Sequence, residues 1–171
     1  AIWSAAPEKV LAVRTDWAET EPHLLGRLMR AVWKAGRWLA QPESRTTAGE
    51  LLSRSAYLDL PAEIIDRALT GHLTISASGE QREVPGFVGF HHGAAGFPWR
   101  SQAKWIAAQM AARSGLDPTR AMARAGAAFR TDLYRQQMAG AGADLPGASE
   151  KLEGNLAHPT AVASSSGRMI L

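Results

Sequence analysis

Apolar residues recur at helical spacing along most of this chain. From Pro22 to Leu39 they fall three and four residues apart, which predicts an amphipathic helix with its basic side chains mostly off the apolar stripe. Pro42 follows and ends this helix. The same spacing predicts further helices at 48–55, 61–70, 102–114, from Pro118 onward, and at 131–138.

Individual residues fix the ends of these helices. Thr47 begins a capping-box pattern, which predicts that a helix starts directly after it. Ser101 is the candidate N-cap of the helix that follows it. Gly71 and Gly115 are suited to ending helices, because glycine readily adopts the left-handed conformation.

Three stretches depart from the helical pattern. Residues 10–13 form a short apolar run with branched side chains, which predicts a buried strand. Residues 73–77 alternate between apolar and polar, which predicts a second short strand, and a turn follows at 78–80. Glycines and prolines make 85–98 a long irregular segment.

Composition narrows the class of protein. The 171 residues fit one domain, and 46% apolar with 20% charged residues is a normal globular balance. The net charge of +3 is small and scattered, so direct nucleic-acid binding is not expected. The absence of cysteine excludes disulfides, thiolate metal sites and a cysteine nucleophile. The chain starts at Ala1 and stops within an apolar stretch, so we expect it to be a piece of a longer protein.

The sequence contains no motif of catalysis, phosphate binding or zinc binding, so we expect a non-enzyme without cofactor or metal. The adjacent His91 and His92 do not change this expectation, because neighbouring side chains diverge and no carboxylate lies at ligand spacing. Trp99 with Arg100 could form a donor or cation–π pair, but a loop anchor is the favoured interpretation.

An ordered series of short motifs runs through the chain. In order they are Pro7-Glu8-Lys9, the apolar run 10–13, Asp16-Trp17, the proline-started helix, Tyr57-Leu58-Asp59-Leu60-Pro61, Thr70-Gly71-His72, Phe97-Pro98-Trp99-Arg100-Ser101-Gln102 and Trp105. The series resembles the C-terminal half of the nitrate- and bicarbonate-binding proteins of ABC importers (the NrtA/CmpA type) and their soluble nitrate-sensing relatives. The resemblance covers most of residues 1–155.

This resemblance implies an α/β fold, helix-dominated here, that is the C-terminal portion of a type II periplasmic-binding-protein fold. Residues 1–15 would be the end of lobe II and the crossover strand. Residues 16–145 would be the helical C-terminal part of lobe I. Residues 146–171 would form a loop-like, truncated tail.

The resemblance also implies a ligand site at Lys9. In nitrate-binding members a lysine at this position contacts the anion, whereas bicarbonate-binding members tend to carry an acidic residue. Nitrate accepts hydrogen bonds poorly, so its site needs a full positive charge in a water-poor cleft. By the same resemblance, the family's other anion contacts would come from sequence upstream of Ala1. Trp3 and Trp17 flank the segment, and packing that supports the cleft is the favoured role for both.

Three functions stay open. The leading hypothesis is the solute-binding component of an ABC-type nitrate or nitrite importer, with a membrane permease as partner and a periplasmic or outer-face membrane-associated location. The second is a cytoplasmic nitrate sensor that controls an RNA-binding antiterminator partner. The third is a helical interaction fragment without a ligand site.

Overall fold

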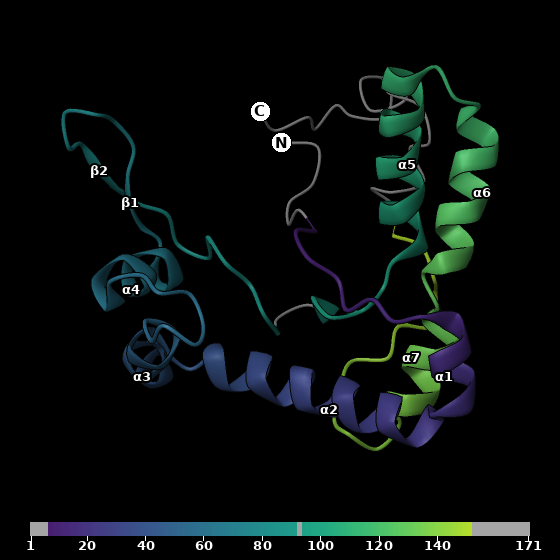
Figure 1. Ribbon diagram of the computed structural model, residues 1–171, viewed down its shortest axis with the longest axis horizontal. Coiled ribbons are helices and arrows are strands. Elements are labelled where there is room, and N and C mark those ends of the chain that lie inside the picture. Colours follow the sequence, from purple (N-terminus) through teal and green to yellow (C-terminus); the bar gives the residue numbers. More distant parts are fainter. Residues whose placement is uncertain (1–6, 92–93, 152–171) are drawn as a thin grey trace. The chain divides into compact units, whose positions relative to one another are not determined.

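The computed structural model describes residues 7–91 and 94–151, and helices dominate this part of the chain (Figure 1). The elements are α1 Thr15–Thr20, α2 Pro22–Leu39, α3 Pro42–Leu52, α4 Ala62–Thr70, β1 His72–Thr74, β2 Gln81–Glu83, α5 Arg100–Ser114, α6 Pro118–Ala128 and α7 Thr131–Met138. They divide into two compact units, the first containing residues 7–30 and 97–151 and the second the described residues of 31–96. Within the described ranges, no helix is both long and apolar enough to cross a bilayer.

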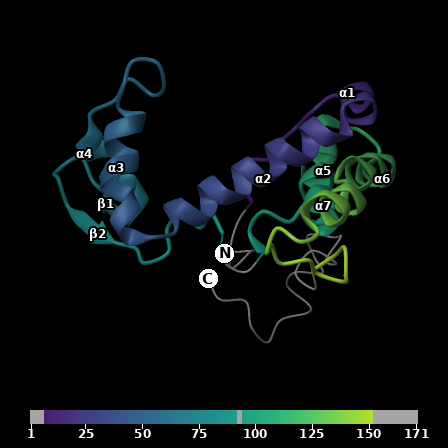
Figure 2. The same cartoon turned by 90° about the horizontal axis from the view of Figure 1, so that it is seen from below.

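In the first unit, α5 and α6 form a helical hairpin and lie side by side (Figure 1 and Figure 2). Gly115 ends α5 in the left-handed conformation, as the sequence predicts, with φ of 65°. Asp117 caps α6 by accepting a hydrogen bond from the Thr119 N–H at 2.9 Å. Gly126 is buried beneath the Lys104 side chain, and a Cβ there would lie 2.9 Å from Lys104 Cε, so a larger residue would displace that side chain.

A short peptide, residues 146–151, is fastened to α5 and α7; we call it the strap. Arg135 on α7 is its main anchor. The guanidinium Nε donates to the Pro146 carbonyl at 2.9 Å, and Nη2 donates to the next two carbonyls at 3.0 and 2.9 Å. Nη1 and Nη2 each lie 3.3 Å from Ser149 Oγ. One charged side chain therefore satisfies three successive backbone acceptors.

The strap in turn satisfies buried groups of the helices. The Ser149 carbonyl accepts from the Arg100 N–H at 3.0 Å, and the Ser149 and Thr131 hydroxyls lie 3.0 Å apart. The Lys151 N–H donates to Ser101 Oγ at 3.0 Å. Ser101 and Thr131 are fully buried hydroxyls, and such groups cost free energy when they have no partner.

An aromatic cluster lies beneath the Arg135 side chain. The buried Phe97 ring meets Trp99 edge-on at 4.7 Å between centroids and Tyr134 at 5.3 Å. The Arg135 guanidinium carbon lies 5.1 Å from the centre of the Phe97 ring. Burial raises the pKa of the Tyr134 hydroxyl, with a smaller contribution from the charge of Asp144.

The first half of α2 packs against α7 in the same unit. Gly26 is buried, and a Cβ at this position would lie 2.2 Å from Oε1 of Gln137. Arg30 donates through Nη1 to the Gln137 carbonyl at 2.9 Å. Leu25 and Met138 are buried. An alanine at this position would displace the ends of the Gln137 and Arg30 side chains, so the glycine leaves room for these contacts between α2 and α7.

In the second unit, α3 and α4 form the helix pair that the sequence predicts. Gly49 is buried in α3, where a Cβ would lie 3.3 Å from the Ala62 carbonyl oxygen. Arg67 on α4 ties the following hairpin to this pair. Its Nε donates to the His72 carbonyl at 3.2 Å, and its Nη2 donates to Thr74 Oγ1 at 2.5 Å.

The hairpin of β1 and β2 is antiparallel, with His72 opposite Glu83. Gly79 lies in its turn with φ of 87°, in the turn that the sequence predicts. The alternating pattern at 73–77 indicates the first strand but extends beyond its end at Thr74. The sequence pattern misses β2, because all its residues are exposed and it therefore lacks an apolar alternation.

The prediction of a buried strand at residues 10–13 is wrong for the structure. These residues are extended but belong to no strand, and Val10, Leu11 and Val13 are exposed. A strand requires hydrogen bonds to a neighbouring strand, and none of the described residues pairs with this run. An apolar run alone does not supply that neighbour.

Two predicted helix starts are also wrong. α3 begins at Pro42 rather than after Thr47, because proline at the first helical position is compatible with the helix and takes priority over the capping-box pattern. α5 begins at Arg100 with Trp99 as N-cap, so Ser101 lies inside the first turn. The Ser101 hydroxyl instead accepts a hydrogen bond from the strap.

The apolar stripe predicted on α2 is only partly buried. Leu25 and Gly36 are buried, while Leu28 and Val32 are exposed.

Gly71 and Gly79 form a matched pair for testing the second unit. Both have φ near 80°, but a Cβ at Gly71 would lie 2.3 Å from the Val84 carbonyl oxygen, whereas nothing lies within 4 Å of one at Gly79. We expect Gly79→Ala to cost about 1 kcal/mol through backbone strain alone. Gly71→Ala should cost at least about 3 kcal/mol, because a clash is added. Urea unfolding measures both, and equal costs would contradict the packing described.

Arg135 allows a second test, in the first unit. Arg135→Gln removes the charge and the fork that reaches three carbonyls. We expect the free energy of unfolding to fall by about 2 to 3 kcal/mol, measured in urea. Arg124→Gln, on the exposed surface of α6, is the control and should change it by less than about 0.5 kcal/mol. An Arg135 variant as stable as the control would show that the strap is not anchored this way.

Candidate functional site

Lys9, the candidate ligand residue, lies in the extended segment that precedes α1. Its side chain is 85% exposed, and its Nζ lies 2.7 Å from Oε1 of the adjacent Glu8. The hydrogen bond from Lys9, and then its charge, lower the pKa of Glu8. An exposed pair between sequence neighbours is weak. The Lys9 ammonium can therefore exchange Glu8 for another anion at little cost.

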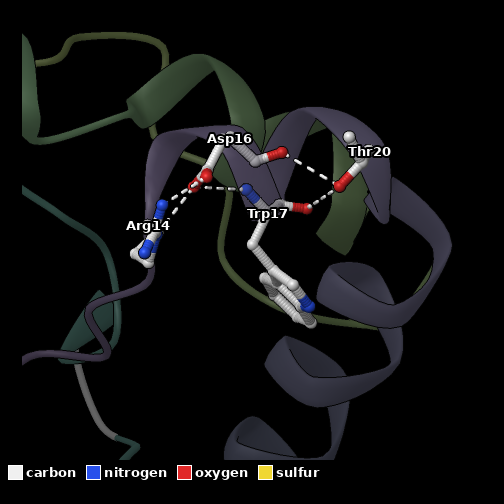
Figure 3. Close-up of polar contacts among 4 residues, drawn as sticks. All are labelled: Arg14, Asp16, Trp17 and Thr20. Atoms are coloured by element: carbon white, nitrogen blue, oxygen red, sulfur yellow. Dashed lines mark hydrogen bonds and ion pairs between the residues drawn. The ribbon is translucent and has the colours of Figure 1, made fainter.

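Asp16 organises the start of α1 (Figure 3). Arg14 approaches it in bidentate fashion, with Nε 2.9 Å from Oδ1 and Nη2 2.5 Å from Oδ2. Oδ1 also accepts from the Trp17 N–H at 2.9 Å, and the Thr20 hydroxyl donates to the Asp16 carbonyl at 3.0 Å. Residues Thr15–Thr20 form a short helix of their own before α2 begins at Pro22.

Electrostatics distinguish the two cations of this segment. The hydrogen bond from Arg14, followed by that from the Trp17 N–H, lowers the pKa of Asp16. The same Asp16 contact raises the pKa of Arg14. Arg14 is thus committed to a carboxylate that also stabilises the helix start. Lys9 pairs only with its sequence neighbour among the described residues, which leaves it the more available cation of the two.

Of the two flanking tryptophans, only Trp17 lies within the described residues. Trp17 is half-buried on α1, and its indole points away from the Arg14–Asp16 pair (Figure 3). Trp3 lies outside the described residues. A role for either ring in supporting a ligand cleft stays a prediction, as does ligand binding by Lys9.

A second polar site, which the sequence does not reveal, lies in the first unit. It is an open hollow of about 430 Å³ between α5, α6 and the strap. Three cations and two carboxylates line it together with small residues of α6; the charged residues are Arg100, Lys104, Arg130, Asp132 and Glu150. The one signal in the sequence is that Arg100 and Lys104 stand a helical turn apart. The cation over the Trp99 ring is Lys151, 5.1 Å away, rather than Arg100.

Most charges in the hollow are paired. Lys104 forms an ion pair with Glu150. Arg130 contacts Asp132 with Nε at 2.9 Å from Oδ1 and Nη2 at 2.6 Å from Oδ2. This hydrogen bonding from Arg130 lowers the pKa of Asp132 to about 2, so Asp132 is ionised at neutral pH. In the part of the chain that the structure describes, no group of three or more His, Cys, Asp or Glu side chains could hold a metal ion.

Comparison with known proteins supports the resemblance that the motifs indicate. The NMT1-like family profile matches residues 1–53. The bicarbonate-binding protein CmpA of Synechococcus elongatus is 25% identical over 109 residues, 61% of this chain and 24% of that protein. The nitrate/nitrite binding protein NrtA of Synechocystis sp. is 34% identical over 68 residues, 39% of this chain and 15% of that protein. The nitrate import ATP-binding protein NrtC of Synechococcus elongatus is 27% identical over 146 residues, 84% of this chain and 22% of that protein.

The fold has a solved counterpart. The crystal structure of the periplasmic nitrate-binding protein NrtA from Synechocystis PCC 6803 matches with a TM-score of 0.73 and 23% identity, over 81% of this chain and 37% of that one. The chain therefore has part of a periplasmic-binding-protein fold, which confirms the predicted fold class. It spans at most about a quarter of the length of these three sequence relatives.

The ionisation of Asp132 gives a test of the hollow. A carboxyl whose pKa is lowered in the folded state stabilises that state above its ordinary pKa, and the contribution is lost as pH falls through the folded pKa. The window is therefore from pH 3.8 down to about 2. Because the pair is half-exposed, we expect less than about 1 kcal/mol. We expect a carbon NMR titration to show that Arg130→Gln raises the pKa of the Asp132 carboxyl and that Arg124→Gln leaves it unchanged. A pKa of Asp132 that stays low in Arg130→Gln would contradict the pairing.

Proposed function

We propose that this chain is the C-terminal portion of the periplasmic solute-binding component of an ABC-type nitrate or nitrite importer. The observation that carries the proposal is that NrtA is similar to this chain both in sequence and in fold. NrtA is 34% identical to the chain over 68 residues, and a solved NrtA shares its fold over 81% of the chain. CmpA and NrtA are both named as binding proteins, which supports a non-enzymatic role for this chain.

The chemistry of Lys9 favours nitrate or nitrite over bicarbonate. All three are small monoanions, but bicarbonate carries a hydroxyl that can donate a hydrogen bond to an acidic side chain. Nitrate and nitrite only accept, so a cation is the matching partner. Lys9 is a compact charge with a weakly held neighbour, Glu8, that an anion can replace.

The mechanism that fits this assignment is cleft closure. The anion would bind between the two lobes of the parent protein, and Lys9 would supply positive charge from one lip. Closure removes water around the pair, which strengthens the attraction between Lys9 and the anion. The closed form would then be recognised by the membrane permease. The ligand would leave chemically unchanged.

A second candidate function rests on the match to NrtC. An ATP-binding transport protein contains a segment similar to 84% of this chain, although that segment is 22% of its length. The chain could thus be a ligand-binding segment attached to an ATP-binding component of the same kind of importer. The coding sequence next to this segment distinguishes the two, because an ATP-binding component carries a phosphate-binding loop.

Titration calorimetry of the parent protein tests the leading proposal. We expect it to bind nitrate, and we expect Lys9→Glu to weaken binding at least about tenfold, because an attractive charge contact becomes repulsive. Lys34→Glu is the matched control, since Lys34 is an exposed lysine on α2, and it should leave the affinity unchanged.

Two results would contradict this proposal. Unchanged nitrate affinity in Lys9→Glu would remove Lys9 from the site. Micromolar nitrate binding by the isolated 171 residues would show that the site does not depend on the rest of a binding-protein fold, because the site we propose is shared with sequence outside this chain.

A further inference from the structure

Arg100 differs from the other cations that line the hollow of the first unit. Lys104 is paired with Glu150, and Arg130 is paired with Asp132. The Arg100 side chain makes one hydrogen bond, from Nε to the Phe129 carbonyl at 3.3 Å. Within residues 7–91 and 94–151, its two terminal nitrogens have no hydrogen-bond acceptor, and no carboxylate forms an ion pair with it, although Asp132 and Glu150 line the same hollow. Among the described residues, Arg100 is therefore the cation of the hollow whose charge is not paired directly with a carboxylate.

The orientation of this guanidinium is restricted. Arg100 is half-buried as the first residue of α5, and its backbone N–H is held by the Ser149 carbonyl of the strap at 3.0 Å. The Phe129 carbonyl accepts from Nε, so the terminal nitrogens remain the available donors. A planar fork of two such donors matches the two oxygens of a carboxylate or phosphate. Because the fork is already oriented, little side-chain entropy is lost when an anion binds.

The hollow has room for more than an inorganic ion. Its volume of about 430 Å³ lies in the range of small-molecule sites. Ala123 and Ala127 leave one wall open and apolar. The carboxylates of Asp132 and Glu150 lie on the lining and can accept hydrogen bonds from hydroxyl or ammonium groups. The three cations and two carboxylates give the lining a net charge of +1, which favours a ligand with one negative charge.

We propose that this hollow binds a small organic oxyanion, a molecule with one carboxylate or phosphate group that forms a bidentate contact with Arg100. The Asp132 and Glu150 side chains orient its hydroxyl groups. The site lies on α5 and α6 and uses none of the residues assigned to nitrate, so it is a second ligand site. It does not depend on the function proposed above.

The test uses the 171-residue chain and NMR of the arginine side chains. The probes are acetate and lactate for the carboxylate class, glycerol 3-phosphate for the phosphate class, and glycerol as a neutral control. We expect the Arg100 Nε signal to shift saturably with either the carboxylate probes or the phosphate probe, and not to shift with glycerol. Arg100→Gln should weaken binding about tenfold or more, as seen in the remaining signals of the hollow, whereas Arg113→Gln on the same helix should not.

A second variant keeps Arg100 intact. Ala123→Leu fills the hollow from an exposed helix position, and Ala128→Leu places the same side chain on α6 outside it. We expect loss of binding in the first and unchanged binding in the second. Lys9→Glu should leave binding unchanged, which separates this site from the nitrate proposal. No saturable shift with any charged probe, or equal binding by Arg100→Gln or Ala123→Leu, would overturn the proposal.

Discussion

The clamp formed by Arg135 on the strap is the contact on which the first unit depends. It fixes three successive carbonyls, and a peptide held at three points is held in register. That register decides which strap atom meets each buried hydroxyl. Ser149 reaches Thr131 and the start of α5, and the Lys151 N–H reaches Ser101. A one-residue shift of the strap would separate the Ser149 hydroxyl from Thr131 and leave that buried hydroxyl without this partner.

The same register determines the charge of the hollow. Glu150 lies between two anchored strap residues, so its carboxylate is directed to Lys104. Asp132, in the first turn of α7, is paired with Arg130, the N-cap residue of the same helix. Both carboxylates of the lining are therefore paired with other cations, and no carboxylate in the described part of the chain pairs with Arg100. The attachment of the strap directs Glu150 to Lys104 and so contributes to leaving the Arg100 charge without a carboxylate partner among the described residues.

Local signals in the sequence predict most helices but neither the clamp nor the hollow. α2, α6 and α7 follow from apolar spacing, prolines and the Asp117 cap, all of which act within a few residues. The strap is predicted correctly as lacking helix, but its attachment relies on Arg135, eleven residues from Pro146, and on Ser101, fifty residues from Lys151. Contacts at such separations have no pattern in a single sequence. Lys9 was found only through resemblance to a family, because nothing local distinguishes it.

The exposed run at residues 10–13 connects the structure to the proposed parent protein. Val10, Leu11 and Val13 are 61%, 48% and 40% exposed, although branched apolar residues in extended backbone are the composition of a central strand. Burying one such side chain is worth roughly 1.5 to 3 kcal/mol, so leaving three in water is unfavourable. A sheet in the rest of a binding-protein fold would cover this run. Lys9 immediately precedes it, so ordering the run would also fix the position of the Lys9 charge, which a strong anion site requires.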